Sequence, residues 1–262
     1  MIDPETTSTA FNAFLASGFP FQTAIAHTIR GIQDCNIVEQ EFPWREDSGV
    51  DRFLDLVVRK FNNIIAIECK KTHKDILLFL QPKGIRSENV TGSRLLHLTQ
   101  IEDSSMRLEL YCADWQFHPA SAESVFCTVS TSASGKDQRL LEKDAQLIVR
   151  GADAYGRHLK KERQHTLGYA SRPIIPVIVT NAKLCTASYD PKEISLETGQ
   201  LPATSQCQFS SVEWVRFRKA FTATPEVGDR TVFVVAASSM VRFLEALQRV
   251  PYCEPESMVH FV

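Results

Sequence analysis

The chain has 262 residues, of which 44% are hydrophobic and 23% charged, and these fractions are ordinary for a globular protein with a full core. No apolar run approaches the roughly 20 residues that a membrane-spanning helix needs, so we expect no membrane partner. The N-terminal stretch MIDPETTSTA is acidic and polar, which argues against a secretory signal. The net charge of -2 excludes a strongly basic chain that coats nucleic acid, although local basic clusters remain.

The seven cysteines are scattered, with no CxxC pair and no Cys/His cluster. Zinc is held by such clusters, so we do not expect a zinc site. Scattered thiols in a chain without a secretory signal are typical of a reducing compartment, which predicts a cytoplasmic protein.

The N-terminal third predicts two helices followed by three strands. Residues 6–16 read as a short helix ending at Gly18, and Pro20 stands where a second helix begins. The apolar residues of the second helix follow at helical spacing: Phe21, Ile25, Ile29 and Ile32. Three segments read as strands: 37–44, 51–59 and 64–70. The turn at 61–63 joins the last two strands into a hairpin.

The remainder alternates between strands and helices. Residues 76–130 hold several strand-like segments, and we interpret them as a β-rich insertion. Residues 137–164 form the clearest helix, with one continuous apolar stripe: Leu141, Ala145, Ile148, Ala152, Tyr155 and Leu159. Residues 174–180 are apolar on both faces, as a central strand should be, and the long helix would bring this strand in parallel to its partner.

Three further segments complete the predicted fold. Residues 182–209 read as loop-rich, 231–236 as a peripheral strand and 238–249 as a closing helix. The sequence therefore predicts an α/β protein with a mixed β-sheet flanked by helices, in a single domain that spans residues 1–262.

Three charged residues are set in the two strands of the predicted hairpin. Glu68 and Lys70 share a face of their strand because side chains alternate. The centre of the turn decides whether Asp55 lies opposite Glu68 or opposite Lys70. Both registers gather the three groups on one face, whereas a slip of one residue would pair Asp55 with Cys69 and scatter them.

Two neighbouring carboxylates repel each other unless a cation lies between them. Mg²⁺, or Mn²⁺ in its place, suits such a pair, with waters and phosphate oxygens completing its shell. Lys70 beside this ion could orient or deprotonate an attacking water, or stabilise the charge of the transition state. A nearby dication would lower the pKa of Lys70, which suits the base role. The alternative is an ordinary hairpin in which Lys70 neutralises one carboxylate.

The segment RFLDLVVRKFNNIIAIECKK resembles the core of the PD-(D/E)XK nuclease superfamily. Asp55 matches its first acidic position and Glu68-Cys69-Lys70 its triplet, while Leu54 stands where the proline of the name would be. The resemblance implies a restriction endonuclease-like fold and a Mg²⁺ ion bound by Asp55, Glu68 and the backbone carbonyl of Cys69. The order of the predicted elements is similar to that of the family as well.

The resemblance also points to residues around this core. Many members carry a glutamate on the first helix, and this chain offers Gln22 there; Glu39 or Glu41 could supply the missing charge, or be exposed strand carboxylates. Three further residues are candidates for substrate binding, with an ordinary surface or helix-end position as the alternative for each: Lys71, His73 and Gln138.

The resemblance implies a metal-dependent nuclease that hydrolyses phosphodiester bonds of DNA, in restriction, defence or repair, and a homodimer would suit duplex cleavage. The alternative is a catalytically reduced nuclease fold that binds nucleic acid or a protein without cutting, which the neutral Gln22 and the net charge favour. A third possibility is an α/β protein of another function that carries the triplet by chance.

Overall fold

A computed structural model describes eight stretches of the chain: residues 3–72, 76–84, 90–100, 108–129, 140–162, 172–202, 205–221 and 228–249. Two residues expected to bind substrate, His73 and Gln138, lie outside these stretches. No helix in the described stretches is both long enough and apolar enough to cross a bilayer.

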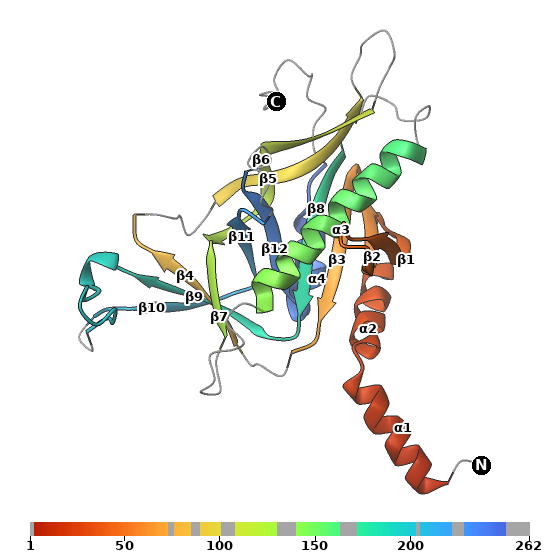
Figure 1. Ribbon diagram of the computed structural model, residues 1–262, viewed down its shortest axis with the longest axis horizontal. Coiled ribbons are helices and arrows are strands. Elements are labelled where there is room, and N and C mark those ends of the chain that lie inside the picture. Colours follow the sequence, from red (N-terminus) through yellow and green to blue (C-terminus); the bar gives the residue numbers. More distant parts are fainter. Residues whose placement is uncertain are drawn as a thin grey trace.

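The larger of two sheets has eight strands in the order β1-β2-β3-β8-β12-β11-β6-β5 (Figure 1). In that order they are Cys35–Arg45, Asp51–Lys60, Asn63–Lys70, Arg172–Thr180, Arg230–Ala236, Trp214–Lys219, Leu108–Ser124 and Val90–Gln100. One side of β8 pairs with β3, and its other side pairs first with β5 and then with β12. Five strands, β8, β12, β11, β6 and β5, therefore close into a circuit, while β3, β2 and β1 extend from it as an open sheet.

The smaller sheet has four strands in the order β10-β9-β4-β7. They are Gln208–Val212, Lys183–Tyr189, Ile76–Pro82 and Phe126–Val129. The segment expected as a β-rich insertion, 76–130, supplies β4 and β7 here and β5 and β6 to the larger sheet. The expectation of loops over 182–209 was wrong for β9 and for the start of β10. Small residues such as Ala187 give β9 little alternation, so this strand is recognised only from its pairing with β4 and β10.

The described stretches hold four helices: α1 (Pro4–Ala16), α2 (Phe19–Arg30), α3 (Leu140–Glu162) and α4 (Met240–Ala246). The last three flank the larger sheet on its two faces. Short 3-10 turns lie at Pro191–Glu193 and Ala237–Ser239. The predicted apolar stripe of α3 is buried in full against one face of the sheet, while α2 and α4 pack on the other face. The mixed α/β architecture with helices on both faces is therefore confirmed.

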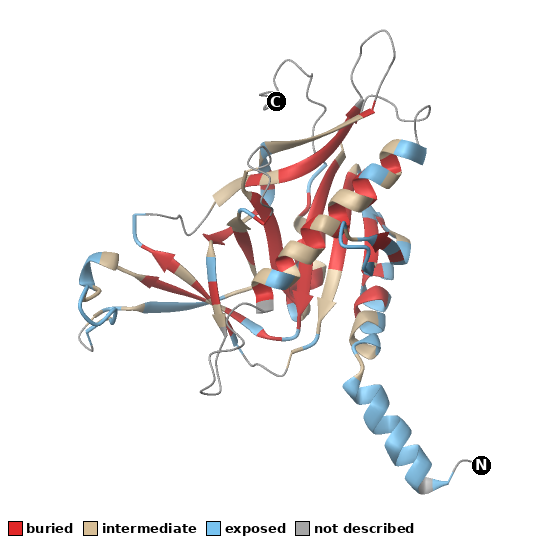
Figure 2. Ribbon diagram, viewed as in Figure 1, coloured by how far each residue is buried: buried red, intermediate tan, exposed pale blue. Residues whose placement is uncertain are grey.

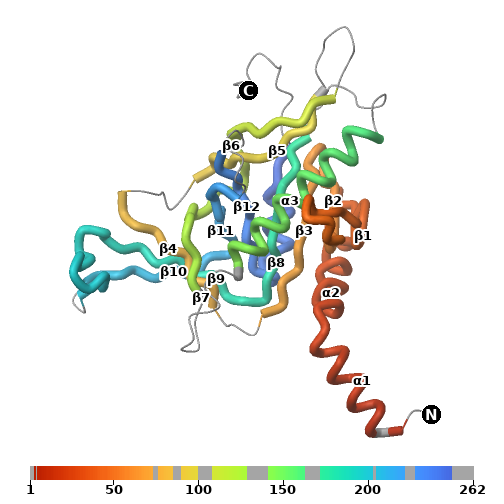
Figure 3. The backbone as a smooth tube through the Cα atoms, viewed as in Figure 1, coloured from red at the N-terminus to blue at the C-terminus, as the bar shows by residue number. Residues whose placement is uncertain are grey.

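The hairpin and the crossover match the expectations from sequence. β2 and β3 pair antiparallel, and β8 runs parallel to β3 after α3. Figure 3 shows the teal β8 beside the orange β3. The strand at 231–236 was wrongly expected at the periphery: β12 lies between β8 and β11, and all seven of its residues are buried. The closing helix α4 ends at Ala246, earlier than expected, because Leu247 is already extended.

Helix α1 projects from the body of the protein and is exposed along its length (Figure 2). Asp3 caps its N-terminus by accepting a hydrogen bond from the Thr6 backbone N–H at 2.9 Å. The helix leaves large apolar side chains in solvent, among them Phe11 and Phe14. The buried apolar side chains form two core clusters, one that contains α3 and one that contains α2 and α4, and neither includes a residue of α1.

A close approach at Gly151 holds α3 against β2. A Cβ atom at this position would lie 2.5 Å from Leu54 Cδ2 and 3.2 Å from Trp44 Nε1, and both neighbours are buried. We expect Gly151→Ala to lower the free energy of unfolding by about 1–3 kcal/mol, although alanine normally favours a helix over glycine. Chemical denaturation would measure the loss.

Gly92→Ala in β5 is the matched control, since a Cβ atom there meets nothing within 4 Å. The control should change stability little. A stabilised Gly151→Ala variant would show that Leu54 moves aside freely and that α3 is not held at this point.

Candidate active site

The β2–β3 hairpin brings the three predicted residues together. Leu56 pairs with Ile67, so Asp55 lies opposite Glu68, which confirms one of the two registers expected from the sequence. Asp55, Glu68 and Lys70 all line one cavity of about 440 Å³. The cavity lies where α2, β1, β2, β3 and α3 meet, so the sheet and a helix from each of its faces contribute to it.

Both β1 and β2 are irregular beside this cavity. Leu54 packs in the core cluster that contains α3, whereas Leu56 packs in the cluster of α2 and α4. In a regular strand these two residues would face the same side, so the alternation breaks at Asp55. Opposite, on β1, Glu41 has a φ of 54°, in the left-handed region that a non-glycine residue adopts at a cost of about 1–3 kcal/mol. Both Asp55 and Glu41 line the cavity at this break.

The carboxylate of Asp55 is half-buried beside the carboxylates of Glu68 and Glu41. Its Oδ2 accepts a hydrogen bond from the Cys69 backbone N–H at 2.6 Å. Burial and the neighbouring charge of Glu68 nonetheless raise the pKa of Asp55 to about 7. Burial also raises the pKa of Glu68 above its ordinary value, against the opposing effect of Lys70. Negative charge at this site is therefore only partly compensated by the protein.

The ammonium group of Lys70 lies between two carboxylates. Its Nζ is 2.8 Å from Glu68 Oε1 and 3.2 Å from Asp144 Oδ1 on α3. Burial alone would lower the pKa of Lys70, but the two carboxylates outweigh burial and raise that pKa. The sequence predicted a lowered pKa for Lys70 on the assumption that a dication lies beside it. In the protein alone the pKa of Lys70 is raised, so Lys70 is a cation and not a base.

Gln22 links three elements beside this group. Its Nε2 donates to the backbone carbonyl of Asp55 at 3.2 Å and to Oε1 of Glu41. Helix α2 therefore reaches the site with Gln22, at the place where the resemblance expects a carboxylate. Glu41 brings a carboxylate to the cavity lining from β1, whereas Glu39 is exposed and is not among the lining residues.

Of two other predicted residues, Cys69 is among the lining residues of the cavity and Lys71 is not. The side chain of Cys69 packs against the cluster of α2 and α4, on the far side of β3 from Lys70, as expected. Burial, with the charges of Asp55 and Glu68, raises the pKa of its thiol, so it is no nucleophile. Lys71 lies outside the cavity lining, and its Nζ donates to the backbone carbonyl of Leu15 at the end of α1.

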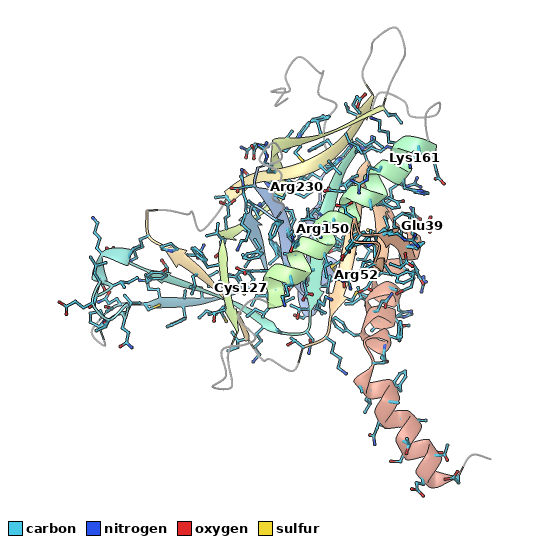
Figure 4. All side chains as sticks on the ribbon, viewed as in Figure 1. Glu39, Arg52, Cys127, Arg150, Lys161 and Arg230 are labelled. Atoms are coloured by element: carbon cyan, nitrogen blue, oxygen red, sulfur yellow. The ribbon has the colours of Figure 1, made fainter. Side chains whose placement is uncertain are left out.

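The sequence analysis missed several residues of the site. Asp144 carried a signal, because it stands three residues after Leu141 and four before Ile148, and so on the apolar stripe of α3. Arg52, labelled in Figure 4, lines the cavity from β2 and pairs with Glu46 at 2.8 Å. The lining also includes two exposed aromatic residues that no spacing rule identifies: Phe19 and Phe53.

The donor groups fit a hard divalent cation. One carboxylate oxygen of Asp55 accepts the Cys69 backbone N–H, and one of Glu68 contacts the Lys70 ammonium. The raised pKa of Asp55 marks a place where added positive charge is favourable. Within the described stretches no three His, Cys, Asp or Glu side chains converge as a complete metal site. Mg²⁺ does not require one, since it is held by one or two carboxylates with water and substrate oxygens.

Comparison with known proteins leaves the class of this protein to be argued from its own geometry. The chain matches no protein-family model, no curated protein and no solved structure. The cavity and its charged groups are therefore the basis for any assignment of function.

The raised pKa of Asp55 makes a prediction about stability and pH. The folded protein holds the proton up to about pH 7, and the unfolded chain loses it near 3.8, so ionisation of Asp55 costs stability as the pH rises between these values. In metal-free buffer Asp55→Asn should therefore raise the melting temperature at about pH 8, by about 2–4 °C per kcal/mol gained. The gain should shrink as the pH falls towards about 4.

Asp51→Asn is the control for this measurement. The hydrogen bond and charge of Arg45 lower the pKa of Asp51, so its removal should stabilise the protein at no pH. A gain for Asp55→Asn that stays constant from about pH 4 to about pH 8 would contradict the account of the Asp55 carboxyl.

Proposed function

We propose that this chain is a divalent-metal-dependent nuclease that hydrolyses phosphodiester bonds of DNA, with a role in restriction, defence or repair. The observation that carries the proposal is the meeting of Asp55, Glu68 and Lys70 in one cavity. The order of elements supports membership of the PD-(D/E)XK superfamily: a helix, an antiparallel meander of β1, β2 and β3, a crossover helix and the parallel strand β8.

The chain's own groups divide the work of such a reaction. Asp55, Glu68 and the backbone carbonyl of Cys69 would hold the ion, which when bound polarises the phosphodiester and lowers the pKa of water. Lys70 keeps its proton between Glu68 and Asp144. Its ammonium therefore stabilises the negative charge that develops on the phosphoryl oxygens, a role that suits a fixed cation.

A second candidate is a protein of the same fold that binds nucleic acid or a protein without cleavage. Gln22 favours this candidate, because a neutral amide replaces the carboxylate that the resemblance expects. The net charge of -2 favours it as well. The fixed ion pairs of Lys70 favour the nuclease, since a half-buried lysine between two carboxylates has no evident use at a surface that only binds.

Binding of the ion can be measured without any substrate. We expect millimolar Mg²⁺ or Mn²⁺ to raise the melting temperature, by an amount equivalent to about 2–3 kcal/mol at a hundredfold excess over Kd. Asp55→Ala and Glu68→Ala should abolish the shift, and Glu39→Ala, which removes an exposed carboxylate outside the cavity, should retain it. An equal shift in all four proteins would place the ion elsewhere.

Cleavage is the direct test of the proposal. With Mg²⁺ or Mn²⁺, the protein should cut plasmid or single-stranded DNA, and Lys70→Ala should be about 10²–10³-fold slower. Lys183→Ala, which removes an exposed lysine of β9, should cut like the wild type. If metal binds at the site and no DNA is cut, the binding protein becomes the better candidate; equal cutting by wild type and Lys70→Ala would indicate a contaminant.

A further inference from the structure

Two exposed phenylalanines stand at the lining of the candidate active site. Phe19 opens α2 and is 66% exposed, and Phe53 lies on β2, two residues before Asp55, and is 53% exposed. Both line the same cavity as the charged groups. Large aromatic faces in solvent beside a polar site offer flat surfaces on which a planar ligand can stack.

The charges of the cavity do not suit a ligand held by its phosphates alone. Its two cations are already paired, Lys70 with Glu68 and Asp144, and Arg52 with Glu46. The lining holds four carboxyl groups: Glu41, Asp51, Asp55 and Glu68. Duplex DNA is bound mainly through unopposed lysine and arginine contacts to its phosphates. Affinity at this site must therefore come from another part of the nucleic acid.

Bases can supply this affinity only when they are unpaired. In a duplex each base face is covered by its neighbours, and proteins reach only base edges in the grooves. In a single strand the faces are open, and each base stacked on an aromatic side chain contributes about 1–3 kcal/mol. A cavity of about 440 Å³ is also in the range of sites for small ligands, which suits a nucleotide and not a duplex.

We propose that the cavity takes an unpaired segment of a DNA strand, with bases stacked on Phe19 and Phe53 beside Asp55 and Glu68. This inference rests on the proposed nuclease function, because it names the substrate of the same site. Stacking would bring the strand to the charged groups without a basic surface. Sequence would matter little, since every base has a face to stack.

Binding in metal-free buffer tests the inference apart from cleavage. Fluorescence anisotropy would compare three labelled probes: a thymidine oligonucleotide, an abasic oligonucleotide of the same length and a hairpin duplex. The full chain should bind the thymidine strand at least tenfold more tightly than either of the other two. The abasic strand keeps the phosphates, so this comparison isolates the contribution of the bases.

Substitution of the two aromatic residues locates the stacking surface. Phe19→Ala and Phe53→Ala should each weaken binding of the thymidine strand by roughly 5- to 100-fold. Phe19→Leu and Phe53→Leu, which keep an apolar side chain, should also weaken it and guard against a loss of folding. Phe126→Ala and Phe209→Ala are matched controls, since both residues are exposed on the smaller sheet, and both variants should bind like the wild type.

The outcomes separate this inference from the proposed function. Equal binding of the duplex or the abasic strand, or wild-type binding by both alanine variants, would overturn stacking while metal-dependent cleavage could still stand. Selective binding that depends on Phe19 and Phe53, without cleavage under any divalent ion, would support stacking and remove the nuclease activity.

Discussion

The register of the β2–β3 hairpin is the constraint on which both the core and the candidate site depend. Pairing of Leu56 with Ile67 puts apolar side chains of both strands into the layer under α2 and α4, and it sets Asp55 opposite Glu68. A slip of one residue would transfer the apolar set to the opposite face of the sheet, under α3, and would separate the two carboxylates. The burial of ordinary aliphatic residues therefore holds the like-charged carboxylates together, which their own repulsion would not do.

Lys70 connects this hairpin to the crossover helix. Its contacts with Glu68 and Asp144 join β3 to α3, so the packing of the apolar stripe of α3 also positions the second carboxylate. Burying three charged groups is expensive unless they are paired, and here one cation serves two anions. Asp55 has a backbone N–H as its donor, and burial together with the charge of Glu68 outweighs this hydrogen bond and raises the pKa of Asp55.

The local part of this arrangement was predictable from the sequence, and the non-local part was not. The strand pattern predicted the hairpin and left two registers for it, and the helical period predicted which side of α3 is buried. The interior place of β12 and the strand β9 depend on pairing with segments far along the chain, which no short pattern encodes. Asp144 was missed because its partner Lys70 is distant in sequence, and the break in alternation at Asp55 because a period of two assumes a regular strand.

The closed circuit of five strands has a consequence for the edges of the larger sheet. Among the described strands of this sheet, β1 ends the order with one side unpaired. Open edges invite strands of other molecules to add, which leads to aggregation. Pro43 offers no N–H donor within β1, and the left-handed backbone at Glu41 interrupts its regular geometry. The distortion that brings Glu41 to the cavity thus also makes this edge a poor template for growth into fibres.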